Sequence, residues 1–212
     1  MQYLVKQGDH LAKIAAEHGF ADWRTIWNRS ENAALKKSRD PNVLYPGDKL
    51  FVPEREAKRE SAASDKRNRF VVRKQPLELR LVLKDFGFKA FAGQECVLEV
   101  DGESAWVRSG GDGVIKQAIA PHAQRAVLRL TGAKASFIAL FAIDIGHLDP
   151  VDTVTGQKAR LNNLGYAAGP LDDEDPARFK SAVEEFQCDH GLAVDGKCGP
   201  KTQAKLEEIH GC

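Results

Sequence analysis

The amino-acid sequence predicts a multidomain α+β protein whose 212 residues form three successive units. Residues 1–53 have the apolar pattern of a strand, two helices and a returning strand, whereas residues 69–146 alternate between apolar and polar as β-strands do. Residues 147–212 return to helical spacing, with small residues at the expected turns. The stretch 54–68 is charged and lacks periodic apolar residues, which predicts a solvated linker between the first two units.

Charge and hydropathy exclude several classes of partner. The net charge is +1, so no basic excess favours generic attraction to nucleic acid or to an anionic membrane. The longest apolar run, Phe137 to Ile143, is far too short to cross a bilayer. No apolar segment typical of a secretion signal follows Met1, so we expect synthesis in the cytoplasm without a signal peptide.

The cysteines leave three alternatives open, which rank in the order isolated thiols, a disulfide and a metal site. An even number of cysteines proves little in a chain of this length. The spacing of cysteines and histidines matches no standard zinc finger, so no metal and no cofactor is expected. The four cysteines are Cys96, Cys188, Cys198 and Cys212, the last three being candidates for a disulfide and, with His190 and His210, for zinc.

Local signals define the elements of the first unit. Tyr3 to Lys6 predicts a strand, and the apolar face of residues 11–15 predicts a helix that Gly19 ends. Asp22 is a suitable N-cap for a second helix, on which Trp23 and Trp27 have the spacing of core residues. A turn at 45–48 then leads into a returning strand at 49–52.

Three blocks of this unit resemble the LysM family, namely Val5 to Ala15, Trp27-Asn28 and Leu44 to Pro53. The resemblance implies a βααβ fold that binds polymers containing N-acetylglucosamine between the loop after the first strand and the loop before the second. His10 departs from the family, in which threonine is commoner after Gly-Asp. The glycan-binding residues that the resemblance implies are Gly8, Asp9, His10, Leu11, Asn42, Leu44, Tyr45 and Pro46.

A narrower resemblance concerns residues 22–28 and 40–47, which are similar to the LysM variant of proteins that accompany type VI secretion and related contractile injection systems. In that setting LysM folds often hold tube and spike proteins together rather than gripping sugar. The resemblance therefore implies spike or effector proteins as alternative partners, and delivery to the periplasm or to a target cell by the injection system.

The middle unit, residues 69–146, is predicted to be a small β-sandwich of six or seven strands. Leucines at 77, 79, 81 and 83 alternate strictly, and Asp101-Gly102 is a strong hairpin signal. The pattern from Leu83 to Pro121 resembles the immunoglobulin-like spacer domains attached to type VI spike and effector proteins. That resemblance implies a spacer or docking role.

The last unit, residues 147–212, is predicted to be a three-helix bundle. Phe179, Val183 and Phe186 share one helical face, and Pro200 suits the first turn of the final helix. The blocks Leu161 to Tyr166, Ala182 to Gln187, Gly191 to Gly196 and Gly199 to Thr202 resemble the peptidoglycan-binding domain found beside bacterial cell-wall hydrolases. The chain departs from that family at Gln157, where an apolar residue is usual, and at Leu171 to Arg178, which replace a glycine-rich loop. A bundle kept only for protein docking is the alternative.

No catalytic residues are predicted. The acidic run at 172–175 lacks the opposed placement across a cleft that glycosidases use, and no HExxH motif occurs. Cys96 lies in an alternating strand and is a poor candidate nucleophile. The sequence therefore predicts a non-catalytic peptidoglycan-binding protein that is bivalent for the wall and serves an injection system. The alternatives are a purely structural adaptor and a cell-wall hydrolase with an unrecognised site.

Overall fold

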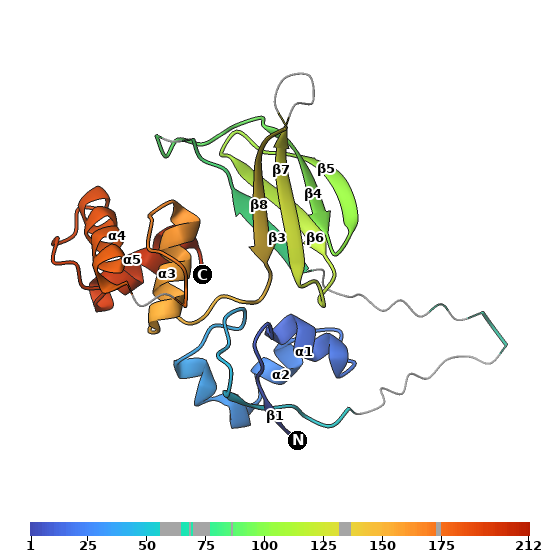
Figure 1. Cartoon of the computed structure of the whole chain (residues 1–212). Helices are drawn as coiled ribbons and strands as arrows, with labels where there is room; N and C mark the ends of the chain where they lie inside the picture. Colours follow the sequence, from blue (N-terminus) through green and yellow to red (C-terminus); the bar gives the residue numbers. More distant parts are fainter. Residues whose placement is uncertain (56–64, 68, 70–76, 86, 132–136, 173–174) are drawn as a thin grey trace. The chain divides into compact units, whose positions relative to one another are not determined.

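The computed structural model describes residues 1–55, 65–67, 69, 77–85, 87–131, 137–172 and 175–212 (Figure 1). Most of the predicted linker and the stretch 70–76 lie outside these residues. The chain forms two compact units, the first comprising Met1, Leu11–Ser30 and Phe51–Gly146, and the second Gln2–His10, Glu31–Leu50 and His147–Cys212. The division into domains at residues 53, 68 and 146 stays a prediction.

The N-terminal residues have the predicted order of strand, helix, helix and strand. The elements are β1 (Gln2–Leu4), α1 (Leu11–Glu17), α2 (Arg24–Trp27) and β2 (Lys49–Phe51), and β1 pairs with β2 in a two-stranded sheet. The expected apolar face of α1 is buried. Two 3₁₀ helices that the sequence did not predict, Ser30–Asn32 and Leu35–Lys37, occupy part of the long connection before β2.

The middle of the chain forms two antiparallel sheets. Strand β3 pairs with β6, and the other sheet has the order β5-β4-β7-β8. The hairpin predicted at Asp101-Gly102 joins β4 to β5, and both turn residues have positive φ angles, +47° and +92°, as a type I′ turn requires. The strands are β3 (Leu77–Val82), β4 (Glu95–Val100), β5 (Glu103–Arg108), β6 (Val114–Ile119), β7 (Arg125–Thr131) and β8 (Phe137–Asp144).

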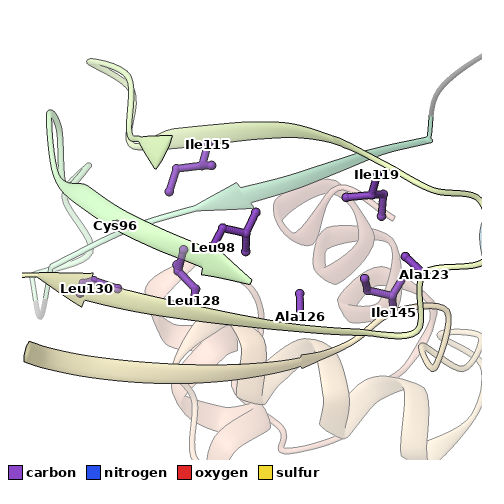
Figure 2. Close-up of a cluster of buried hydrophobic side chains, with 9 residues drawn as sticks. All are labelled: Cys96, Leu98, Ile115, Ile119, Ala123, Ala126, Leu128, Leu130 and Ile145. Atoms are coloured by element: carbon purple, nitrogen blue, oxygen red, sulfur yellow. The ribbon is translucent and has the colours of Figure 1, made fainter. Parts of the chain in front are cut away.

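Both sheets contribute side chains to one apolar core, which Figure 2 shows in close-up. Leu77, Leu79 and Leu81 of β3 all pack against this core. They share one face of the strand, because successive side chains of a strand point to opposite faces. Two sheets thus share one core, while the immunoglobulin-like sandwich stays a prediction. The buried core residues are Cys96, Leu98, Ile115, Ile119, Ala123, Ala126, Leu128, Leu130 and Ile145.

The C-terminal helices are α3 (Val154–Leu164), α4 (Pro176–Asp189) and α5 (Pro200–His210). Side-chain caps mark the starts of α3 and α4. The Thr153 hydroxyl accepts from the Gly156 N–H, and the Asp175 carboxylate accepts from the first N–H groups of α4. In the described part of the chain, no helix is both long and apolar enough to span a membrane. The buried core of these helices comprises Leu161, Tyr166, Ala168, Ala182, Val183, Phe186 and Leu206.

Candidate functional site

The structure brings together the two loops that the LysM resemblance assigns to sugar binding. The Val5 N–H donates to the Asp48 carbonyl at 3.0 Å, and the Gly47 N–H donates to the Val5 carbonyl at 2.9 Å. These two bonds hold the chain after β1 beside the chain before β2. A ligand at one loop would therefore lie near the other.

The first loop, residues 8–11, is a buried turn. The Asp9 carboxylate accepts from the Tyr3 hydroxyl at 2.8 Å and from the Lys6 N–H at 2.9 Å, which fixes the turn from within. Asp9, His10 and Leu11 are only 4%, 3% and 1% exposed. Their side chains present little surface to a sugar, and their assignment as glycan contacts stays a prediction.

The second loop carries the exposed members of the predicted set. Tyr45 is 38% exposed, and Asn42 is exposed as well, whereas Leu44 is buried. The Asp48 carboxylate accepts from the Tyr45 N–H and from Arg39 Nε, both at 2.9 Å. The Arg39 guanidinium lies 5.8 Å from the centre of the Tyr45 ring. Tyr45 is therefore an exposed aromatic ring on a fixed turn, which is a suitable platform for a sugar face.

Arg39 and Asp48 are supporting residues that the sequence reasoning missed. Asp48 follows the turn glycine at 47, and an aspartate at that place is a recognisable signal of a side chain that holds its own turn. Arg39 carried no comparable signal, because its role depends on a contact made by folding.

The tryptophans differ in exposure. Trp27 is 7% exposed, in agreement with the predicted core role, and Trp23 is partly covered, with the Arg24 guanidinium 4.7 Å from its ring. Trp106 on β5 is 68% exposed and lines a shallow, open hollow of about 430 Å³ with Glu95, Val107 and Arg108.

In the C-terminal bundle, the loop between α4 and α5 is organised by Gln187, which is 1% exposed. Its Oε1 accepts from the N–H groups of Asp195 and Gly196, both at 3.0 Å. Its Nε2 donates to Asp195 Oδ1 at 2.9 Å and to the Lys197 carbonyl and Thr202 Oγ1, both at 3.0 Å. The buried amide thus fixes a surface loop on which Val194 is 56% exposed.

The loop after α3 is held in a similar way by polar side chains of that helix. Asn162 donates to the Gly169 carbonyl at 2.7 Å and accepts from the Ala168 N–H at 2.9 Å, while Lys158 Nζ donates to the Pro170 carbonyl at 3.1 Å. Gln157 is buried and donates to the Val151 carbonyl at 2.8 Å, so this departure from the family pattern has a structural partner. Residues 173–174 of the acidic run lie outside the described part.

Arg160 is a cation buried in the bundle, and it is 1% exposed. It donates to the carbonyls of Cys212 at 2.8 Å, Asp149 at 2.8 Å and Gly156 at 2.9 Å. Burial, and then the charge of Arg160, lower the pKa of His210. These contacts tie the last residue of the chain to the start of α3.

All four cysteines are free thiols. Cys198 and Cys212 flank the 11 residues of α5, whose rise of about 16 Å is too long for a disulfide between them. Over the residues that the structure describes, no group of three or more His, Cys, Asp or Glu side chains is arranged to hold a metal ion.

Comparison with known proteins finds a similarity in the C-terminal helices. Residues 152–206 match the family model described as "Putative peptidoglycan binding domain". The chain is also 38% identical over 55 residues to the N-acetylmuramoyl-L-alanine amidase CwlM of Mycobacterium tuberculosis (strain ATCC 25618 / H37Rv), a match that covers 26% of this chain and 14% of the amidase. The chain thus spans a small part of that relative's length, and no solved structure matched. The residues that match the peptidoglycan-binding domain model, 152–206, contain α3, α4 and most of α5.

Proposed function

We propose that the protein is a non-catalytic peptidoglycan-binding protein that contacts the wall through the C-terminal bundle and through the Tyr45 loop. The observation that carries the proposal is the family match at residues 152–206, which coincides with the helices that share one buried core. Tyr45 adds a second point of contact, and two linked sites would raise retention on a polymer by avidity.

The two loops share a physical design that supports binding. In each, one buried or half-buried polar side chain fixes the backbone, Asp48 in the first and Gln187 in the second. In each, an exposed side chain stands on the fixed turn, Tyr45 at 38% and Val194 at 56% exposure. A preorganised loop loses less conformational entropy on binding, so its exposed side chains are the best candidates for contact with the glycan or its peptide.

The finer part of the proposal is that this wall binder is an accessory or cargo of a contractile injection system. Its support is the resemblance of residues 22–28 and 40–47 to the LysM variant of such systems. A purely structural adaptor for spike or effector proteins is the alternative, and it differs from the first proposal by predicting no affinity for peptidoglycan.

A hydrolase is the second candidate, because the similar protein from Mycobacterium tuberculosis is an amidase. The matched 55 residues are 14% of that protein and lie on the segment that matches the binding-domain model. For this reason we retain binding without catalysis as the proposed function.

The test is co-sedimentation of the full-length protein with purified peptidoglycan sacculi, together with an assay for released muropeptides. We expect retention without release. Tyr45→Ala and Val194→Lys should each weaken retention, and the double variant should weaken it most. Tyr45→Phe keeps the ring, and Val154→Lys changes a valine of similar exposure, 55%, elsewhere on the bundle, so both should bind as the wild type does.

Each alternative has its own outcome. If the wild-type protein does not sediment with sacculi, wall binding is refuted, and co-purification with spike proteins becomes the test of the adaptor. If soluble muropeptides are released, the protein is a hydrolase and the non-catalytic proposal is wrong.

A further inference from the structure

Strand β8 (Phe137–Asp144) differs from the other edge strands of the two sheets of residues 77–144, because its only charged residue is Asp144 at its end. In the two sheets formed by the described strands of residues 77–144, β3, β5, β6 and β8 each pair on one side, which makes them the edges of those sheets. Natural edge strands are usually protected from pairing with another chain by charged residues. The charged residues within the other three edge strands are Glu78 and Arg80 in β3, Glu103 and Arg108 in β5, and Lys116 in β6. From Phe137 to Ile143, β8 has none.

Apolar side chains are exposed on both faces of this edge. Leu140 lies opposite Arg129 of β7, on the outer face of the sheet, and is 52% exposed. Phe141 lies opposite the buried Leu128, on the core face, and is 49% exposed. An edge that is apolar on both faces and uncharged from Phe137 to Ile143 is a template for a further strand.

We propose that β8 pairs with β8 of a second copy of this chain, in an antiparallel arrangement with the two-fold axis at Phe141. Antiparallel neighbours share a face, so this register places Phe141 opposite its counterpart on the core side. On the outer side it places Leu140 opposite Ala142 of the second copy. The two four-stranded sheets become one continuous sheet of eight strands.

The sequence of β8 is complementary to itself in this register. The register covers residues 138–144 of each copy, and Asp144 falls opposite residue 138, so no like charges meet across the new ladder. Large Leu140 meets small Ala142, and the same pair recurs on the other side of the axis. A two-fold interface requires one patch to complement itself, and β8 meets that requirement.

The inference goes beyond the proposed function and does not depend on it. The interface consists of a single pair of strands, so it is small and we expect the dimer to dissociate in the micromolar range. A dimer would carry two copies of each wall-binding loop, and its formation can be measured without any ligand.

The first experiment is analytical ultracentrifugation of the full-length protein from low to high micromolar concentration. We expect a concentration-dependent rise toward twice the monomer mass. Leu140→Lys should abolish dimer formation, because a charge replaces an apolar contact. The two introduced lysines would also lie diagonally across the two-fold axis and repel each other. Trp106→Lys is the matched control, since Trp106 is 68% exposed on β5, the opposite edge of the same sheet, and this variant should dimerise normally.

A charge-pair rescue tests the register. Ala142→Glu alone should also weaken the dimer, but the double variant Leu140→Lys with Ala142→Glu should restore it, because each lysine then faces a glutamate of the other copy. A wild-type protein that stays monomeric overturns the proposal. The proposal is also overturned if Leu140→Lys still dimerises or if Trp106→Lys loses the dimer to the same extent. A double variant that stays monomeric overturns it as well.

Discussion

The buried amide of Gln187 should control the order of the loop between α4 and α5. In Gln187→Met the side chain keeps its approximate size, so the main loss is of hydrogen bonds rather than of volume. The N–H groups of Asp195 and Gly196 lose their acceptor, and the Lys197 carbonyl and Thr202 hydroxyl lose a donor. At about 1 kcal/mol for each backbone N–H, and more where water cannot replace the partner, the local cost is about 2–4 kcal/mol.

Hydrogen exchange followed by mass spectrometry is the suitable assay, because a chain with several folding units has no single well-defined melting free energy. A cost of about 2–4 kcal/mol corresponds to exchange that is about 30- to 700-fold faster for protected amides of residues 187–199. Amides of the two sheets should be unaffected. The loop's order would also affect wall binding, since Val194 stands on it.

The control is Gln203→Met, which removes a half-buried amide that donates to the Cys198 carbonyl at 2.8 Å. We expect a cost of about 1 kcal/mol or less from this single bond. If Gln187→Met leaves exchange of the loop within about threefold of wild type, the buried amide does not organise the loop and the reasoning is refuted.

Three further predictions concern the same bundle. Phe186→Ala removes a fully buried ring that packs edge-to-face on Tyr166 at 5.4 Å, and it should destabilise the bundle by about 3–5 kcal/mol, measured by exchange of α3 and α4; near-wild-type protection would contradict this. Burial raises the pKa of the Cys198 thiol to about 11, so iodoacetamide at pH 8 should alkylate exposed Cys188 well before Cys198, and equal rates in peptide mass spectrometry would count against it. The Lys197 N–H, and then Gln187, lower the pKa of the Asp195 carboxyl, so its stabilising effect is present above the unfolded pKa of about 4 and is lost as pH falls through the lower folded value. Loop protection should fall in that range, and Asp195→Asn should remove the pH dependence.

The sequence predicted those parts of the fold that depend on local signals. The hairpin at Asp101-Gly102 was predictable because two adjacent positive φ angles favour that dipeptide. The start of α5 at Pro200 was predictable as well, because proline suits the first turn of a helix. Capping and turn chemistry act within a few residues, so one sequence is enough to recognise them.

Features that depend on distant residues were not predictable. The continuous apolar run of β8 does not say which of its side chains face the core, nor that Phe141, which lies opposite Leu128, stays 49% exposed. Gln187 was identified as part of a family block, yet its partners lie 8 to 15 residues away and meet it only after the loop folds. The LysM pattern predicted where the two sugar-binding loops lie in the sequence, but it did not predict that Asp9 is buried and Tyr45 is exposed.

The difference in exposure between these residues indicates which of them can contact a ligand. A group that recognises a ligand must be held in place by the protein and still have surface free for the ligand. Asp9 and Gln187 satisfy the first condition but are 4% and 1% exposed, so their role is to hold the turns. Tyr45 and Val194 satisfy both, because their turns are fixed and their side chains are open to solvent. If the wall is the partner, Tyr45 and Val194 should contact it directly, whereas Asp9 and Gln187 should affect retention on sacculi only through the order of the turns they hold.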